Sequence, residues 1–169
     1  MSSTTLKEAV DYWASESPDE DKIVRIVAEH GTYSNSELVQ HEYNGILFYC
    51  DPGTPEKAIS LIQDFINQYK PIVKECFANS IELHRFNSDF RYIEGVTASK
   101  ETKGVYDHAW NSYEGYTIDV TRTASERYGA VFPNNIVDSA IPKLEEENCW
   151  SITENNRIDV EKSDFSKET

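Results

Sequence analysis

Three segments in the first 70 residues carry apolar side chains three or four positions apart, the spacing of an amphipathic helix. These positions are Leu6, Val10 and Trp13, then Ile23, Ile26 and Val27, then Ala58, Leu61, Ile62, Phe65 and Ile66. Residues 17–20 (Ser-Pro-Asp-Glu) are typical of a helix start, and Gly31 is typical of a helix end. The pattern also predicts a short helix through Leu38 and Val39. Residues 1–69 are therefore expected to form a helical N-terminal part.

The pattern changes after Pro71. Residues 72–84 predict one further helix, whereas residues 91–97, 106–113 and 116–121 are rich in β-branched and aromatic side chains, as strands are. Glu114-Gly115 suits a tight hairpin turn between the last two strands. The apolar segment 45–50 predicts a buried strand or a short helix. Helices followed by a small antiparallel sheet predict an α+β fold.

The chain has 169 residues, enough for one sizeable core, and we expect a single domain over residues 1–160. Residues 161–169 are expected to be an acidic, flexible tail. The net charge of −14 disfavours binding to nucleic acid or to an anionic membrane, because both need clustered cations. The acidity is also compatible with a high-salt cytoplasm, and so with a halophile or viral origin. Both ends of the chain are acidic, and the middle is nearly balanced.

The cysteine and histidine usage predicts neither a disulfide framework nor a metal site. Three cysteines are an odd number without tight spacing, and the four histidines lack the spacing of metal ligands. The N-terminus shows no secretory leader, and no apolar run is long enough to cross a bilayer. We expect a cytoplasmic protein without a metal or cofactor.

Three residues have the properties of a thiol-based active site. Cys76 is expected near the start of its helix and close to Lys74, and both features favour the thiolate. His108 and Asp119 lie on the two strands of the predicted hairpin, where their side chains are expected to face each other. A carboxylate in that place holds an imidazole in one orientation, and the imidazole then serves as the base of a nucleophile.

The order of these motifs resembles the transglutaminase-like cysteine hydrolases, a superfamily related to the papain-like fold. The similarity rests on Cys76, then Tyr92-Ile-Glu-Gly95, then His108-Ala-Trp110, then Asp119-Val-Thr121, with Val120 where the family commonly has proline. It covers about residues 70–135, which we therefore expect to form a transglutaminase-like core, with loops shorter than in larger members. The segments around Cys76 and Tyr128-Gly-Ala-Val-Phe-Pro133 are similar to small uncharacterised proteins of bacteria, archaea and their viruses.

The resemblance implies a cysteine-dependent hydrolase or acyl transferase with Cys76 as nucleophile, His108 as base and Asp119 as orienting acid. Its substrate is expected to be a neutral or basic protein, peptide or small amide. Further residues are candidates for an oxyanion site or a substrate pocket, namely Asn79, Tyr92, Glu94, Trp110 and Asn111. The alternative is a non-enzymatic binding protein, for example from a virus or mobile element, that retains the fold.

Overall fold

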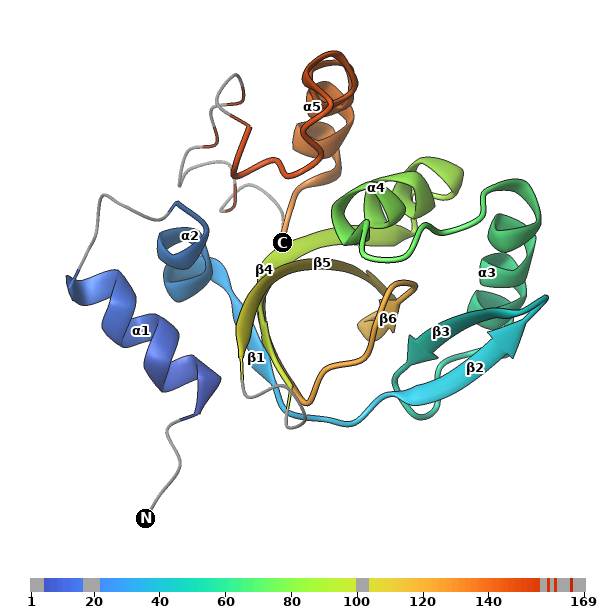
Figure 1. Cartoon of the computed structure of the whole chain (residues 1–169), viewed down its shortest axis with the longest axis horizontal. Coiled ribbons are helices and arrows are strands. Elements are labelled where there is room, and N and C mark those ends of the chain that lie inside the picture. Colours follow the sequence, from blue (N-terminus) through green and yellow to red (C-terminus); the bar gives the residue numbers. More distant parts are fainter. Residues whose placement is uncertain are drawn as a thin grey trace.

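The computed structural model describes residues 5–16, 22–99, 104–155, 158, 160 and 165. Over these residues the chain forms five helices and one seven-stranded antiparallel sheet, so the predicted α+β class is confirmed (Figure 1). The helices are α1 (Leu6–Glu16), α2 (Lys22–His30), α3 (Glu56–Gln68), α4 (Cys76–Phe86) and α5 (Asn134–Glu147). The strands are β1 (Thr32–Ser34), β2 (Val39–Tyr43), β3 (Ile46–Cys50), β4 (Phe90–Ala98), β5 (Val105–Tyr113), β6 (Tyr116–Asp119) and β7 (Glu126–Val131).

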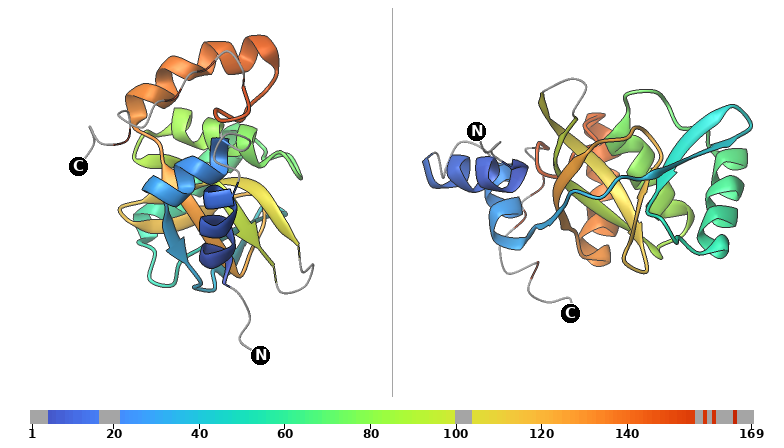
Figure 2. Two further views of the ribbon diagram at one scale, coloured as in Figure 1. Left: turned by 90° about the vertical axis from the view of Figure 1, so that its left-hand side faces the viewer. Right: turned by 90° about the horizontal axis from the view of Figure 1, so that it is seen from below.

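The sheet has the order β1-β7-β4-β5-β6-β3-β2, with β4 and β5 near its centre. It is strongly curved (Figure 1). Helices α1 and α2 lie at one end of the molecule and α3 at the other, while α4 and α5 lie together on one side of the sheet (Figure 2). The curved sheet therefore carries helices at both ends and along one side, and α4 brings its first residue to β5.

Two hairpins share the same turn chemistry. Glu114 and Gly115 have φ angles of 49° and 87°, and they join β5 to β6 as the sequence predicts. Asn44 and Gly45 have φ angles of 49° and 79° and join β2 to β3. Positive φ at both central residues gives the turn a twist that matches its strands.

The prediction of a helical N-terminal part is incomplete. The segments at Leu6–Glu16, Lys22–His30 and Glu56–Gln68 are helices, but the stretch between α2 and α3 contributes three strands to the sheet. The predicted helix through Leu38 and Val39 is wrong, because Val39 begins β2 and pairs with Cys50. Tertiary pairing overrides weak local propensity here. The predicted helix start at residues 17–20 lies outside the described residues.

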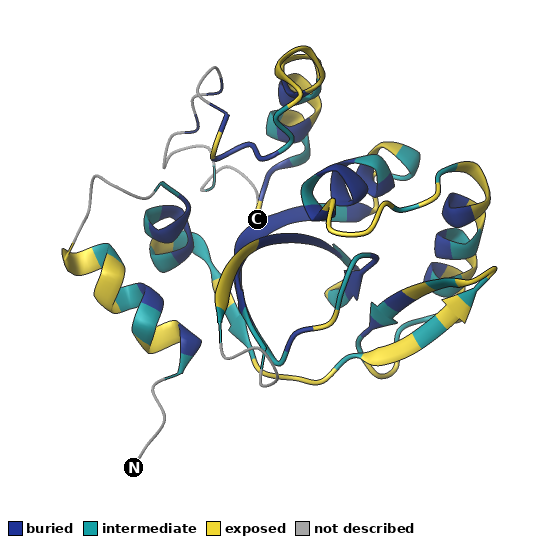
Figure 3. Ribbon diagram, in the orientation of Figure 1, coloured by how far each residue is buried: buried dark blue, intermediate teal, exposed yellow. Residues whose placement is uncertain are grey.

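Three buried apolar clusters hold the helices to the sheet. The first joins α4 and α5 to β4, β5 and β7 and includes Ile81, Tyr92 and Leu144; α5 was not predicted. The second packs α3 against β3, β5 and β6, and the third packs α1 and α2 against β4 and β7. Burial therefore extends along β4 and most of β5, whereas the loop before α4 is exposed (Figure 3).

Most of the expected flexible tail, residues 161–164 and 166–169, lies outside the described residues. Phe165 is described and does not behave as a free tail residue. Its ring stacks on His30 at a centroid distance of 5.0 Å and meets the edge of Phe132 at the same distance. Apolar contact of this kind ties the chain near its end to α2 and to the core.

Candidate active site

Cys76 is the first residue of α4, and the loop before it sets its position. The helix predicted over residues 72–84 begins four residues later, at Cys76, because residues 72–75 form a turn in which Lys74 has a φ of 69°. The first backbone N–H groups of any α-helix have no acceptor within the helix. The Cys76 thiol therefore lies beside N–H groups that are available to bind an oxyanion.

His108 and Asp119 form the shortest polar contact of this site. His108 Nε2 lies 2.6 Å from Asp119 Oδ2, and both side chains are buried. Asp119 ends β6, and its Oδ1 accepts hydrogen bonds from the backbone N–H groups of Thr121 and Arg122 at 3.0 and 3.1 Å. The carboxylate is therefore held on one oxygen by the backbone and on the other by the imidazole.

The Cys76 thiol also interacts with His108, and Nδ1 is the ring nitrogen that does not contact Asp119. Among the described residues, Nδ1 has no hydrogen bond of good geometry. Burial opposes the charged imidazolium, but Asp119 and the nearby Cys76 overcome burial and raise the pKa of His108. Burial likewise opposes the Asp119 carboxylate, but His108 and Arg127 lower the pKa of Asp119 overall. The Asp119 carboxylate therefore favours the charged imidazolium form of His108.

A cavity of about 420 Å³ opens beside Cys76. Its lining consists of Val73, Lys74, Cys76, Phe77, Tyr106, Asp107, Thr121 and Arg122. The Cys76 side chain is nearly buried, with 7% of the residue exposed, but it borders this cavity. Lys74, expected near Cys76 from the sequence, lies at the same cavity.

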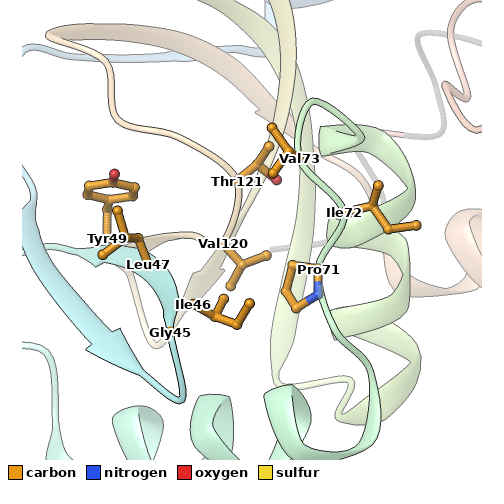
Figure 4. A pocket seen from close by; sticks show the side chains of 9 residues that line it. All are labelled: Gly45, Ile46, Leu47, Tyr49, Pro71, Ile72, Val73, Val120 and Thr121. Carbon is orange, nitrogen blue, oxygen red and sulfur yellow. The ribbon is translucent and has the colours of Figure 1, made fainter.

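A second cavity of about 230 Å³ adjoins the first, since Val73 and Thr121 line both. Figure 4 shows its walls coming from three segments: the β2–β3 hairpin, the loop before α4, and the chain after β6. Its lining residues, Gly45, Ile46, Leu47, Tyr49, Pro71, Ile72, Val73, Val120 and Thr121, carry no ionisable group except the Tyr49 phenol. The two cavities together offer a largely apolar surface to which Val73 contributes in both.

Asn79, a candidate for an oxyanion or pocket residue, uses its side chain to hold the local backbone. Its side-chain N–H groups donate to the Ile72 carbonyl at 2.8 Å and to Thr121 Oγ1 at 3.0 Å, so neither is available. Its oxygen accepts from the Ile72 N–H at 2.9 Å. Asn79 instead fixes the loop before α4 to the chain after β6, and both segments line the cavities.

The other expected pocket residues line neither cavity, because each is used inside the fold. Trp110 stacks on His108, with ring centroids 5.8 Å apart and an interplanar angle of 23°. Asn111 donates to the Ser80 carbonyl at 3.0 Å and so joins β5 to α4. Tyr92 donates to Glu94 at 2.8 Å, and both are fully buried. These residues therefore pack and hydrogen-bond around the site inside the fold and do not face the cavities.

Glu94 holds the segment that follows α5. Its carboxylate accepts hydrogen bonds from Tyr92, from the hydroxyls of Ser151 and Thr153, and from the backbone N–H groups of Ile152 and Thr153. Burial raises the pKa of Glu94, and the donated hydrogen bonds oppose that shift. Sequence spacing gives no signal for the contact with the segment after α5, because Ser151, Ile152 and Thr153 lie 57 to 59 residues from Glu94.

Sequence reasoning also missed Arg127, which lies on β7 with its Nη2 3.5 Å from Asp119 Oδ2. No motif marks Arg127, and only the position of β7 beside β4 places its guanidinium near the site. Within the described residues, no group of three His, Cys, Asp or Glu side chains is placed to hold a metal ion. No helix among the described residues has the length and apolar character needed to cross a membrane.

The chain is thus an α+β protein in which Cys76, at the start of α4, borders a cavity, while His108 and Asp119 form a buried pair that lines neither cavity. In comparisons with known proteins, no family model matched the chain, and no curated protein or solved structure was found to be similar to it.

Proposed function

We propose that the protein is a cysteine-dependent hydrolase or acyl transferase that acts on an amide, peptide or isopeptide bond. The observation that carries the proposal is the convergence of three side chains. Cys76 borders a cavity at the start of α4, His108 lies against the thiol, and Asp119 holds the imidazole at 2.6 Å. This is the set of groups that nucleophilic catalysis by a thiol requires.

The reaction begins when Cys76 Sγ attacks the carbonyl carbon while the thiol proton resides on His108 Nδ1. The oxyanion that forms faces the N–H groups at the start of α4. His108 then donates its proton to the leaving nitrogen, the C–N bond breaks and a thioester remains on Cys76. Water attacks the thioester in hydrolysis, and an amine attacks it in acyl transfer. In either case His108 accepts the proton of the attacking group, and the thiolate is released.

The cavities support a substrate with apolar groups on both sides of the reacting carbonyl. Val73 lines both cavities, and its side chain and that of Ile72 are well exposed beside them. Lys74 and Arg122 line the cavity at Cys76 together with Asp107. Of the neutral and basic substrates expected from the net charge, the two cations favour a neutral group next to Cys76.

A non-enzymatic binding protein is the second candidate, and the small exposure of Cys76 is the observation on its side. Alkylation by iodoacetamide separates the two. We expect Cys76 to react faster than glutathione at neutral pH, and the advantage to shrink at least about tenfold in His108→Ala. Cys149→Ser is the matched control, since Cys149 lines neither cavity. Reaction of Cys76 no faster than glutathione, with the same rate in His108→Ala, would reject the enzymatic proposal.

A library of neutral fluorogenic peptide amides then tests turnover. We expect the wild-type protein to release the fluorophore, and Cys76→Ala and His108→Ala to release it only at the background rate. The Cys149→Ser control should retain the wild-type rate. Adding an amine such as glycine amide distinguishes acyl transfer from hydrolysis, because only transfer yields the amine adduct.

A further inference from the structure

Arg127 is a buried cation, and among the described residues its ion-pair partner is Asp119. Only 3% of the residue is exposed, and its Nη2 lies 3.5 Å from Asp119 Oδ2. Nη1 donates to the Ala124 carbonyl at 3.1 Å, whereas Nε and Nη2 make no hydrogen bond among the described residues. Burying a guanidinium without satisfying its donors is costly, so a specific reason for its place is needed.

The contact with Asp119 acts through charge and does not orient the carboxylate. Three hydrogen bonds already hold Asp119, two from backbone N–H groups and one from His108 at 2.6 Å. Arg127 approaches from a longer distance, with no hydrogen bond of good geometry. What Arg127 adds is a positive charge in a region that excludes water, where charges interact strongly.

The other ionisable groups around this pair do not replace Arg127. Tyr49 and Cys50 lie near the Asp119 charge. Burial raises the pKa of Tyr49 and raises the pKa of Cys50 to about 12, so both side chains are neutral. The charge of Asp51 raises the pKa of Arg127, and the charge of Arg122 lowers it, so the two effects oppose each other. Cys76, on α4, raises the pKa of His108. His108 and Arg127 are therefore the two cations that neutralise Asp119.

We propose that Arg127 serves as the permanent counter-charge of Asp119, so that His108 can release its proton without leaving a buried carboxylate that lacks a cation. The inference rests on the proposed thiol chemistry. When thiolate and imidazolium are both present, the charges of Cys76, His108, Asp119 and Arg127 sum to zero. After His108 gives its proton to the leaving nitrogen and Cys76 is a thioester, Asp119 and Arg127 still balance. Without Arg127 both stages carry a buried negative charge.

The test is an NMR titration of the His108 ring in Arg127→Met and Arg127→Lys. Removing a neighbouring cation stabilises the protonated form of the His108 ring, so we expect the pKa of His108 to rise by about one unit in Arg127→Met. Arg127→Lys keeps the charge and should restore a value near that of the wild type. The rings of His30, His41 and His84 serve as internal references, and the His108→Asn spectrum identifies the His108 signals.

An unchanged or lowered His108 pKa in a folded Arg127→Met would overturn the proposal. Arg127→Gln, which retains N–H donors for the Ala124 carbonyl, replaces Arg127→Met if the latter does not fold. If neither charge-removing variant folds while Arg127→Lys does, Arg127 is a structural residue and the proposal also fails. The titration needs no turnover. Its failure is therefore distinct from failure of the enzymatic proposal, which alkylation of Cys76 tests.

Discussion

His108 and Asp119 meet although they are not opposite each other in the sheet. The last regular pair of β5 and β6 is Asn111 with Ile118, and continuing that register would place Thr121 opposite His108. The 2.6 Å contact instead joins two diagonal residues beyond the point where pairing ends. Asp119 ends β6, and the chain then turns so that its backbone N–H groups return to the Asp119 carboxylate. The same turn places Thr121 and Arg122 at the cavity.

Replacing Asp119 tests this contact. Asp119→Asn removes the charge that raises the pKa of His108, so we expect that pKa to fall by at least about one unit. NMR titration of the ring measures the shift. Asp138→Asn is a matched control, because Asp138 binds another histidine, His84, at 2.8 Å and should leave His108 unchanged. A His108 pKa equal to that of the wild type in Asp119→Asn would refute the coupling.

The same pair makes stability depend on pH in a defined direction. The pKa of His108 is raised in the folded state, so its contribution is full below about 6.5 and is lost as pH rises through the folded value. The pKa of Asp119 is lowered, so its contribution is full above about 3.8 and is lost as pH falls. We expect the free energy of unfolding lost in His108→Gln to be largest between these two values.

Urea unfolding of the wild type and His108→Gln at a series of pH values measures this difference. A difference that is constant from pH 4 to pH 9 would contradict the expected coupling of His108 to folding. His41→Gln provides the control, since His41 lies on β2 outside the candidate site.

Gly129 and Gly95 leave room for the indole that stacks on His108. The two glycines face each other across β4 and β7, and a Cβ on Gly129 would lie 2.5 Å from the Trp110 ring. We expect Gly129→Ala to lower the free energy of unfolding by roughly 1–3 kcal/mol, because the ring has to move. Adding Trp110→Phe should recover part of that loss, as measured by urea unfolding of the single and double variants. Strictly additive losses would show that the ring is not the cause.

Glu94→Gln tests whether the hydrogen bonds between Glu94 and the segment after α5 stabilise the fold. Among the described residues, each hydrogen-bond partner of the Glu94 carboxylate is a donor, so the N–H₂ group of a glutamine amide would face donors. We expect a loss of about 1–3 kcal/mol in the free energy of unfolding. Glu42→Gln is the control, as Glu42 is exposed on β2. A loss of unfolding free energy no larger than in the control would show that the Glu94 hydrogen bonds do not stabilise the fold.

The sequence predicted much of the local structure correctly. Apolar spacing placed α1, α2 and α3, and strand composition placed β4, β5 and β6. The Glu114-Gly115 turn was also correct, because positive φ at those positions depends on local residue types. The sequence missed β1, β2, β7 and α5. The Asn44-Gly45 pair was an available signal for the β2–β3 hairpin, since it is typical of such turns.

By itself, the sequence determined that three segments in the first 70 residues form amphipathic helices, and it marked Cys76, His108 and Asp119 as candidates for a thiol site. Periodicity and turn preferences act over a few residues, and a linear sequence shows them directly. Only the tertiary structure decided that α4 begins at Cys76, that β5 and β6 diverge beside His108, and that Arg127 and Glu94 are buried where they are. Those outcomes depend on how segments far apart in the chain share one core, because burial and charge pairing act between neighbours in space.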